Sequence, residues 1–408
     1  MSTSEIPRRS VKILLLENIH ASAEQLLASE GFQVERVAAA LKKADLIEKL
    51  KGVHALGIRS KSHLDAEVLA SASDLLTVGC YCIGTNQVDL RAAHKRGVPV
   101  FNAPFSNTRS VAEMIIAEII MLARQLGDRS REVHEGRWRK VAIGSYEVRG
   151  KILGIVGYGH IGRQVGVMAE SMGMRVLFFD VKTSLPMGNN QSATSLTQLL
   201  EQSDFVTLHV PETPQTKNMI GREELSRMRP GSYLLNASRG TVVVIDALAE
   251  ALKSKHLAGC AIDVYPEEPE ANGDDFATPL RNLPNVILTP HVGGSTVEAQ
   301  ESIGREVATS FLKFLTAGTT TGAVNFPQIE LPRAEGSRRI LNVHRNVPGV
   351  LRDINKIVSD RDANISAQML STDVDIGYMV MDVETARAEE VADLIAALPT
   401  SLRTRTIA

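Results

Sequence analysis

Through the first 330 positions, short runs of apolar residues alternate with longer amphipathic segments. The apolar runs at 11–16, 53–58 and 75–80 predict buried strands, and the segment 21–30 predicts a helix that Gly31 ends. Strands that alternate with helices are typical of a parallel sheet covered by helices. The N-terminal segment is therefore expected to form one α/β unit.

A second α/β unit is expected after a long amphipathic helix at 110–126. It opens with the apolar run 151–156, and a helix at 296–315 leads the chain out of it. Further strands are predicted at 176–180, 205–210, 233–236, 258–263 and 286–289. Several of these runs end in polar residues, and ligands bind at the carboxyl ends of strands in open parallel sheets.

The pattern changes beyond 327–336, a stretch with two prolines and a glycine that reads as a linker. A helix that begins at Pro348-Gly349 and runs to about 360 would place Leu351, Ile354 and Val358 on one face. Strands are predicted at 340–344, 365–370, 378–383 and 402–407, and a second helix at 386–398. The order β-α-β-β-α-β is that of a ferredoxin-like module.

A glycine motif follows the strand at 151–156 and opens the next helix. It reads Gly157-Tyr-Gly159-His160-Ile161-Gly162, and Asp180 ends the following strand 18 residues after Gly162. This context predicts a dinucleotide site, in which the helix N-terminus binds the pyrophosphate and Asp180 binds the adenosine ribose. The Asp180 carboxylate would repel a 2′-phosphate, so NAD is favoured over NADP. The alternative, a glycine-rich turn without a ligand, does not explain the position of Asp180.

Composition excludes several classes of protein. The formal net charge is −2, so no basic surface for nucleic acid is expected. The most apolar stretch, 114–123, contains Glu118 and is too short to span a membrane. The cysteines, Cys80, Cys82 and Cys260, are odd in number and favour buried thiols in a reducing compartment over disulfides or a metal site. With no export signal visible, we expect a cytoplasmic protein.

Three segments place reactive groups after predicted strands. They contain Arg239 in 236–240, Asp263 and Glu268 in 263–269, and His291 in 289–294. Hydride transfer to or from a small 2-hydroxy acid needs a cation for the carboxylate and an acid/base whose pKa is tuned near the working pH. A histidine beside a carboxylate meets the second need. A lone histidine is more often structural, but three such segments together favour catalysis.

At these motifs the chain resembles the D-2-hydroxyacid dehydrogenase family. Within that family it is similar to the bacterial and yeast enzymes that oxidise (2R)-3-phosphoglycerate in the first step of L-serine biosynthesis. The segments that carry the resemblance are 79–88, 101–113, 157–162, 236–243 and 289–296, of which 102–113 is the most specific to this branch. The resemblance implies a doubly wound, flavodoxin-like substrate domain (1–106 and 297–330) into which a Rossmann NAD domain (107–296) is inserted.

The resemblance also implies a role for each candidate residue. His291 would be the acid/base, Glu268 would keep it protonated, and Arg239 would bind the substrate carboxylate and carbonyl. The substrate phosphate would contact Arg59, Ser60 and Lys61, and Asn107 would lie in a matching loop; the family often has arginine where this chain has Lys61. Beyond the glycine motif, NAD contacts are expected at His209, Pro211, Ala237, Ser238, Arg239, Asp263, His291 and Gly294, and no metal is expected.

The C-terminal module, 337–408, resembles an ACT domain, which senses amino acids. His344, Asn346 and Asn364 match the family's serine site, so L-serine is expected to act as an allosteric inhibitor. A packing or dimerisation module without a ligand is the alternative, and an RNA-binding module fits its charge less well. Where relatives have paired glycines before this module, the chain has Gly336-Ser337. The resemblance suggests a homotetramer, with Trp138 either at a subunit contact or in the core.

Other functions remain open at the sequence level. One of them is the oxidation or reduction of a different acid, such as D-lactate, glyoxylate or 2-oxoglutarate. Reduction of 2-oxoglutarate gives 2-hydroxyglutarate. The chain could instead be a non-enzymatic NAD sensor. The segment 59–61 argues for a phosphorylated substrate, and intact Arg239, Glu268 and His291 argue for an enzyme.

Overall fold

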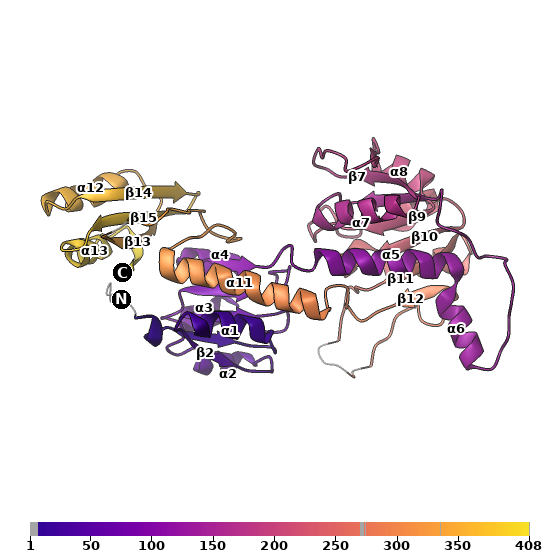
Figure 1. Cartoon of the computed structure of the whole chain (residues 1–408), viewed down its shortest axis with the longest axis horizontal. Coiled ribbons are helices and arrows are strands. Elements are labelled where there is room, and N and C mark those ends of the chain that lie inside the picture. Colours follow the sequence, from indigo (N-terminus) through magenta and orange to yellow (C-terminus); the bar gives the residue numbers. More distant parts are fainter. Residues whose placement is uncertain (1–6, 270–272, 274, 335, 408) are drawn as a thin grey trace. The chain divides into compact units, whose positions relative to one another are not determined.

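The fold was obtained as a computed structural model that describes residues 7–269, 273, 275–334 and 336–407 (Figure 1). The chain separates into two compact units, Met1–Ser106 with Gln300–Ala408, and Asn107–Ala299. The C-terminal module therefore belongs to the same compact unit as the N-terminal sheet, although it has an apolar core of its own.

The first unit begins with a parallel five-stranded sheet in the order β2-β1-β3-β4-β5. This is the flavodoxin-like order expected for a doubly wound domain. Its strands are β1 (Lys12–Leu15), β2 (Gln33–Arg36), β3 (Ala55–Ile58), β4 (Thr77–Cys80) and β5 (Val100–Asn102). Its helices are α1 (Ala21–Ser29), α2 (Lys43–Lys49), α3 (Ala66–Ser71) and α4 (Leu90–Lys95). The strand β2 was not predicted, because most of its residues are exposed and its segment contains no apolar run.

Helix α11 (Val297–Ala317, orange in Figure 1) returns the chain to this first unit. Its buried residues Val307 and Phe311 share one apolar cluster with Ile13 and Leu15 of β1. Gly79 in β4 permits this close packing, because an added Cβ there would lie 2.5 Å from Val307 Cγ1 and 2.7 Å from Phe311 Cζ. The helix therefore forms part of the core under the sheet.

The second unit is built on a parallel seven-stranded sheet in the order β12-β11-β10-β9-β6-β7-β8. The order reverses between β6 and β9, which is the topological switch point of a Rossmann fold. The strands are β6 (Ile152–Val156), β7 (Arg175–Phe179), β8 (Gln191–Ser192), β9 (Phe205–Leu208), β10 (Ser232–Asn236), β11 (Leu257–Ile262) and β12 (Val286–Leu288). The helices are α5 (Thr108–Arg124), α6 (Leu126–His134), α7 (His160–Ser171), α8 (Leu196–Gln202), α9 (Arg222–Arg227) and α10 (Ile245–Lys253).

The C-terminal module has the predicted βαββαβ order, with an antiparallel sheet in the order β14-β15-β13-β16. One expectation is wrong: Leu351 is 38% exposed, and Val350 joins Ile354 and Val358 on the buried face. The helix begins at Val350, directly after the predicted Pro348-Gly349 start, and Gly349 is its N-cap with a φ of 94°. The elements are β13 (Ser337–Arg345), α12 (Val350–Asp360), β14 (Ile365–Thr372), β15 (Ile376–Glu384), α13 (Ala388–Ala396) and β16 (Ser401–Ile407).

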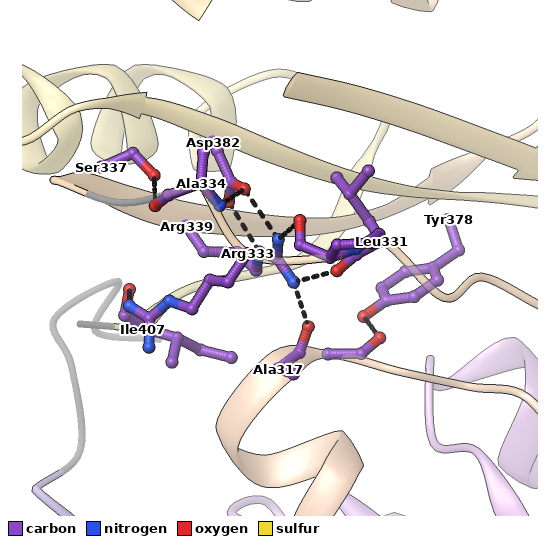
Figure 2. A network of polar contacts seen from close by, with 11 residues as sticks. Ala317, Leu331, Arg333, Ala334, Ser337, Arg339, Tyr378, Asp382 and Ile407 are labelled. Carbon is purple, nitrogen blue, oxygen red and sulfur yellow. Dashed lines mark hydrogen bonds and ion pairs between the residues drawn. The ribbon is translucent and has the colours of Figure 1, made fainter. Parts of the chain in front are cut away.

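The linker at 327–336 is tied to the module by a buried ion pair (Figure 2). Arg339 of β13 and Asp382 of β15 are both fully buried, and their two hydrogen bonds measure 2.6 and 2.7 Å. The Arg339 guanidinium also donates to the carbonyl oxygens of Ala317, Leu331 and Pro332. The side chain therefore joins the end of α11, the linker and the sheet of the module.

Candidate active site

The glycine motif lies between β6 and α7, at the carboxyl edge of the second sheet. Gly157 has a φ of 92°, a left-handed conformation that glycine adopts readily. An added Cβ at Gly162 would lie 2.2 Å from the carbonyl oxygen of Gly157, so the tight turn requires glycine at both positions. Gly159 faces open space, which leaves room for a ligand near its backbone. His160 and Ile161 begin the helix beside it.

Asp180 lies at the end of β7, next to this turn. Its carboxylate accepts hydrogen bonds from the backbone N–H groups of Tyr158, at 2.7 Å, and Lys182, at 2.9 Å. These bonds fix the carboxylate beside the glycine turn. The remaining lone pairs of its oxygens are suited to the hydroxyl groups of a ribose, so the turn and the acid together fit the adenosine half of NAD.

The charge of Asp180 leads to a prediction of cofactor preference. Because the Asp180 carboxylate is held beside the glycine turn, kcat/KM should be at least about tenfold higher with NAD than with NADP. This ratio is equivalent to about 1.4 kcal/mol. The substitution Asp180→Asn should narrow this gap, because the amide carries no charge to repel a 2′-phosphate. Steady-state kinetics with both cofactors would measure it. Equal efficiency of the two cofactors in the unsubstituted protein would refute the assignment.

The other expected NAD residues follow β9, β10, β11 and β12. His209 has one ring nitrogen, Nδ1, buried without a hydrogen-bond partner in the described chain, and burial lowers its pKa to about 3, so it is neutral. Ala237 and Ser238 lie in a loop that Asn236 closes by accepting hydrogen bonds from the Ser238 backbone and hydroxyl. Pro211 is exposed, and Gly294 is half-buried in the loop after His291. Their roles toward NAD stay predictions.

The three catalytic candidates follow three neighbouring strands. Arg239 follows β10, Glu268 follows β11 and His291 follows β12, and these strands are adjacent and parallel in the sheet. The Nδ1 of His291 lies 3.0 and 2.9 Å from the two carboxylate oxygens of Glu268. The backbone N–H of Tyr265 also donates to Glu268 at 3.2 Å. The three groups therefore follow strands that end at one edge of the sheet, and their catalytic roles stay predictions.

Electrostatics in this pair favour the charged form of the histidine. The hydrogen bond from His291 to Glu268 raises the pKa of His291 above its usual value, although burial opposes this shift. Burial acts to raise the pKa of Glu268, but its hydrogen bonds and the nearby positive charges outweigh burial and lower it. Because Nδ1 is bound to Glu268, the half-exposed ring can present Nε2 to a substrate. The pair has the chemistry of a general acid/base.

Asp263, expected only as an NAD contact, also organises the loop that contains His291. Its buried carboxylate accepts hydrogen bonds from the Thr289 hydroxyl and from the backbone N–H groups of Val292 and Gly293. These bonds fix the backbone around His291, whose φ is 55°. No pattern in the sequence indicates this second role, because the bonds form only when β11 and β12 pair.

Glu118 is a buried acid. In the sequence it stands out only as a charged residue within the apolar stretch 114–123. Its side chain lies in α5, and its Oε1 has no hydrogen-bond partner among the described residues. Burial, with a smaller contribution from the charge of Asp263, raises the pKa of Glu118 to about 8. The group is therefore neutral at pH 7. Only the packing of α5 on the sheet could have revealed it.

The residues expected at the substrate phosphate belong to the first unit. Arg59 follows β3 and is half-buried, whereas Ser60 and Lys61 are exposed. Asn107, at the start of α5, belongs to the second unit. Its Oδ1 is buried without a hydrogen-bond partner among the described residues. A phosphate contact for these four residues stays a prediction.

The residues expected to bind serine are separated within one module. His344 and Asn346 lie at the end of β13, where His344 pairs with Gly377 of β15. Asn364 precedes β14, and its carbonyl oxygen accepts from the Glu384 backbone at the opposite end of β15. Seven residues of extended strand correspond to about 20 Å. A single module therefore does not bring Asn364 to His344.

Trp138 is 83% exposed, so its placement in the core is wrong for this chain. The cysteines Cys80 and Cys260 are buried and Cys82 is half-buried, and no disulfide joins them in the described part of the chain. Among the described residues, no helix combines the length and apolar character that a bilayer crossing requires.

Comparison with known proteins agrees with this geometry. Residues 116–293 match the family model "D-isomer specific 2-hydroxyacid dehydrogenase, NAD binding domain", and residues 340–403 match an "AHAS small subunit-like ACT domain". The chain is 54% identical over 405 residues to D-3-phosphoglycerate dehydrogenase of Dictyostelium discoideum, with 99% of both chains covered. It is 50% identical over 408 residues to the enzyme of that name from Escherichia coli K12, again with 99% of both covered.

A solved structure extends the comparison to the fold. The NAD-dependent formate dehydrogenase of Staphylococcus aureus, crystallised with NAD, superposes with a TM-score of 0.64 at 28% identity. The match covers 74% of this chain and 95% of that structure. Full-length relatives, the two family models and the fold agree: the chain belongs to the D-isomer specific 2-hydroxyacid dehydrogenases and, within them, to the D-3-phosphoglycerate dehydrogenases.

Proposed function

We propose that the chain oxidises (2R)-3-phosphoglycerate to 3-phosphooxypyruvate with NAD, the first step of L-serine biosynthesis. The observation that carries the proposal is the hydrogen-bonded His291–Glu268 pair beside the loop of Arg239, at the carboxyl edge of an NAD binding domain. The names of the relatives support the choice of substrate. The cysteines, which form no disulfide among the described residues, support a reducing, cytoplasmic location.

Each of the three side chains has a defined task in this reaction. The Arg239 guanidinium binds the substrate carboxylate and orients the C2 hydroxyl. The Nε2 of neutral His291 accepts the hydroxyl proton, and Glu268 stabilises the imidazolium that results. Bound NAD would supply the acceptor for the hydride of C2. In the reverse direction, protonated His291 donates its proton to the carbonyl oxygen.

An absorbance assay for NADH separates this activity from its rivals. The purified protein would be assayed for oxidation of 3-phosphoglycerate and D-lactate, and for reduction of 2-oxoglutarate. We expect the highest kcat/KM with the phosphorylated acid. A higher kcat/KM for either of the other acids would overturn the proposed substrate, and no turnover of any acid would favour an NAD sensor.

We further propose that L-serine inhibits the enzyme by binding to the C-terminal module. The Nδ1–H of His344 donates to Asn342 Oδ1 at 2.9 Å, and burial lowers the pKa of His344. The neutral ring therefore keeps a lone pair on Nε2, which can accept from the serine amine or hydroxyl. Since Asn364 lies at the far end of the same sheet, a site that uses both residues needs a second copy of the module. Edge strands such as β14 are suited to such pairing.

A contact within the first unit offers a route from the serine loop to the substrate lobe. The Asn346 side chain donates to the carbonyl oxygen of Asp373 at 2.6 Å. The carboxylate of Asp373 in turn lies 2.7 Å from Nε2 of His94, near the end of α4.

With the exposed Trp138 available for a second contact between chains, we propose a homotetramer. The 83% exposure of this large apolar side chain favours an interface.

Substitution of the serine residues should remove inhibition without loss of catalysis. His344→Ala and Asn364→Ala should retain nearly full turnover, but serine should no longer inhibit them, because each loses a polar contact to the ligand. Inhibition should act mainly on kcat, since serine does not enter the substrate pocket. Coupling of about 1–3 kcal/mol is enough for such control.

Steady-state kinetics with and without serine would test this. Two further forms of the protein serve as controls. Serine should still inhibit the variant Asp362→Ala, which changes an exposed residue of the module. A chain that ends near Gln328 should be active but should not respond to serine. Inhibition that persists in the shortened chain, or that competes purely with phosphoglycerate, would contradict the proposed site.

A further inference from the structure

A buried acid holds the loop that contains Arg59, Ser60 and Lys61. Glu17 follows β1, and only 7% of its surface is exposed. Its Oε2 accepts a hydrogen bond from the backbone N–H of Lys61 at 2.9 Å, and its Oε1 accepts one from the backbone N–H of Ser62 at 2.8 Å. Both carboxylate oxygens are therefore used to fix two consecutive peptide groups of this loop.

A second buried side chain holds the other end of the loop. Gln87, which is 6% exposed, donates from Nε2 to the carbonyl oxygen of Arg59 at 2.5 Å. The same amide group lies 3.3 Å from the carbonyl oxygen of Gly84. Glu17 and Gln87 thus bind opposite polar groups of one short loop, the former its N–H groups and the latter a carbonyl.

The backbone of Glu17 supports a specific role for its side chain. Its φ is 59°, and that of the next residue, Asn18, is 52°. Two consecutive non-glycine residues in the left-handed region are uncommon, and such conformations persist only where the surrounding structure fixes them. The result here is that a carboxylate points under the loop between β3 and α3.

We propose that Glu17 and Gln87 are positioning residues that determine the preference for a phosphorylated substrate. The inference rests on the proposed function, which assigns the phosphate to Arg59, Ser60 and Lys61. Because the N–H groups of Lys61 and Ser62 are bound to Glu17, these two groups are not available to the phosphate, and Lys61 can bind it only through its side chain. Recognition by side chains on a short loop depends on where the backbone holds them.

Glutamine at position 17 is a sharp test of this arrangement. A carboxylate accepts two N–H bonds, whereas an amide has one oxygen and presents its NH₂ group to the second N–H. Glu17→Gln should therefore release one of the two peptide groups with almost no change in volume. Gln87→Met should release the carbonyl of Arg59 in the same way. Both loosen the loop without removing any side chain that contacts the phosphate.

The experiment compares 3-phosphoglycerate with D-glycerate, which lacks the phosphate. In each variant we expect KM for 3-phosphoglycerate to rise about tenfold or more, the equivalent of one hydrogen bond to a charged group. Neither kcat nor the kinetics with D-glycerate should change more than about twofold. Inorganic phosphate, used as an inhibitor, should bind correspondingly less tightly. The control Glu35→Gln removes an exposed carboxylate of the same lobe that pairs with Lys49, and it should leave all of these values unchanged.

The two hypotheses fail in different ways. If the unsubstituted enzyme does not prefer 3-phosphoglycerate to D-glycerate, the proposed function is wrong. If it does, but the variants keep its preference and its phosphate inhibition constant, Glu17 and Gln87 do not position the phosphate loop. An equal fall of kcat with both substrates would show a general structural role and would also overturn the inference.

Discussion

Replacing His291 with alanine is expected to lower kcat by about 10²–10⁴-fold, the usual contribution of a positioned general acid/base. The reason is the pair it forms with Glu268, which orients the ring and favours its charged form. NAD affinity should change little, because His291 is expected to contact only the nicotinamide end, whereas the glycine turn and Asp180, after β6 and β7, are expected to bind the rest of the cofactor. Rates from NADH absorbance and NADH binding from fluorescence would measure the two effects separately.

The dependence of this rate on pH checks the same role. Oxidation needs neutral His291 to accept a proton, so kcat/KM should rise as pH increases through the pKa of His291. Because the bond to Glu268 raises that pKa, Glu268→Gln should move the rise to lower pH. Reduction should show the opposite dependence on pH. If His291→Ala retains more than a tenth of kcat, the histidine is not the acid/base.

Breaking the buried ion pair of the C-terminal module should have the second large effect. Asp382→Asn should destabilise this region by about 3–5 kcal/mol, since it leaves the buried charge of Arg339 without its partner. Arg339 also donates to three carbonyl oxygens at the end of α11 and in the linker, so the loss should extend to these segments (Figure 2).

Hydrogen exchange resolved by peptide is the suitable measurement. The only tryptophan, Trp138, lies in the second unit and does not report on the module. Exchange in β13 and β15 should accelerate in Asp382→Asn, whereas exchange in β6 and β9 should not. The double variant Arg339→Met with Asp382→Leu is the matched control. It should recover part of the loss, because no buried charge remains, although the carbonyl oxygens of Ala317, Leu331 and Pro332 lose their donor. Unchanged protection of β13 in Asp382→Asn would contradict the prediction.

Much of the site could be predicted from sequence because its signals are local. The glycine turn requires glycine at 157 and 162 for steric reasons within a few residues, and Asp180 ends the next strand. Arg239, Glu268 and His291 each follow an apolar run, and parallel strands bring their carboxyl ends to one edge. The family resemblance then gave each residue a role. The elements that were missed, such as β2 and β8, are short strands with exposed residues and hence no apolar period.

Other features depend on contacts between segments far apart in the chain. Glu17 reaches residues more than 40 positions away, and Asp263 binds the loop of His291 only because β11 pairs with β12. The helical period allows either Val350 or Leu351 to lie beside Ile354 and Val358, and packing against the sheet buried Val350 and left Leu351 38% exposed. In the same way, the antiparallel register of β13, β14 and β15 decided that His344 and Asn364 lie at opposite ends of one sheet. Sequence periodicity fixes which residues share an element or a face, whereas these pairings depend on register and long-range packing, which only the tertiary structure determines.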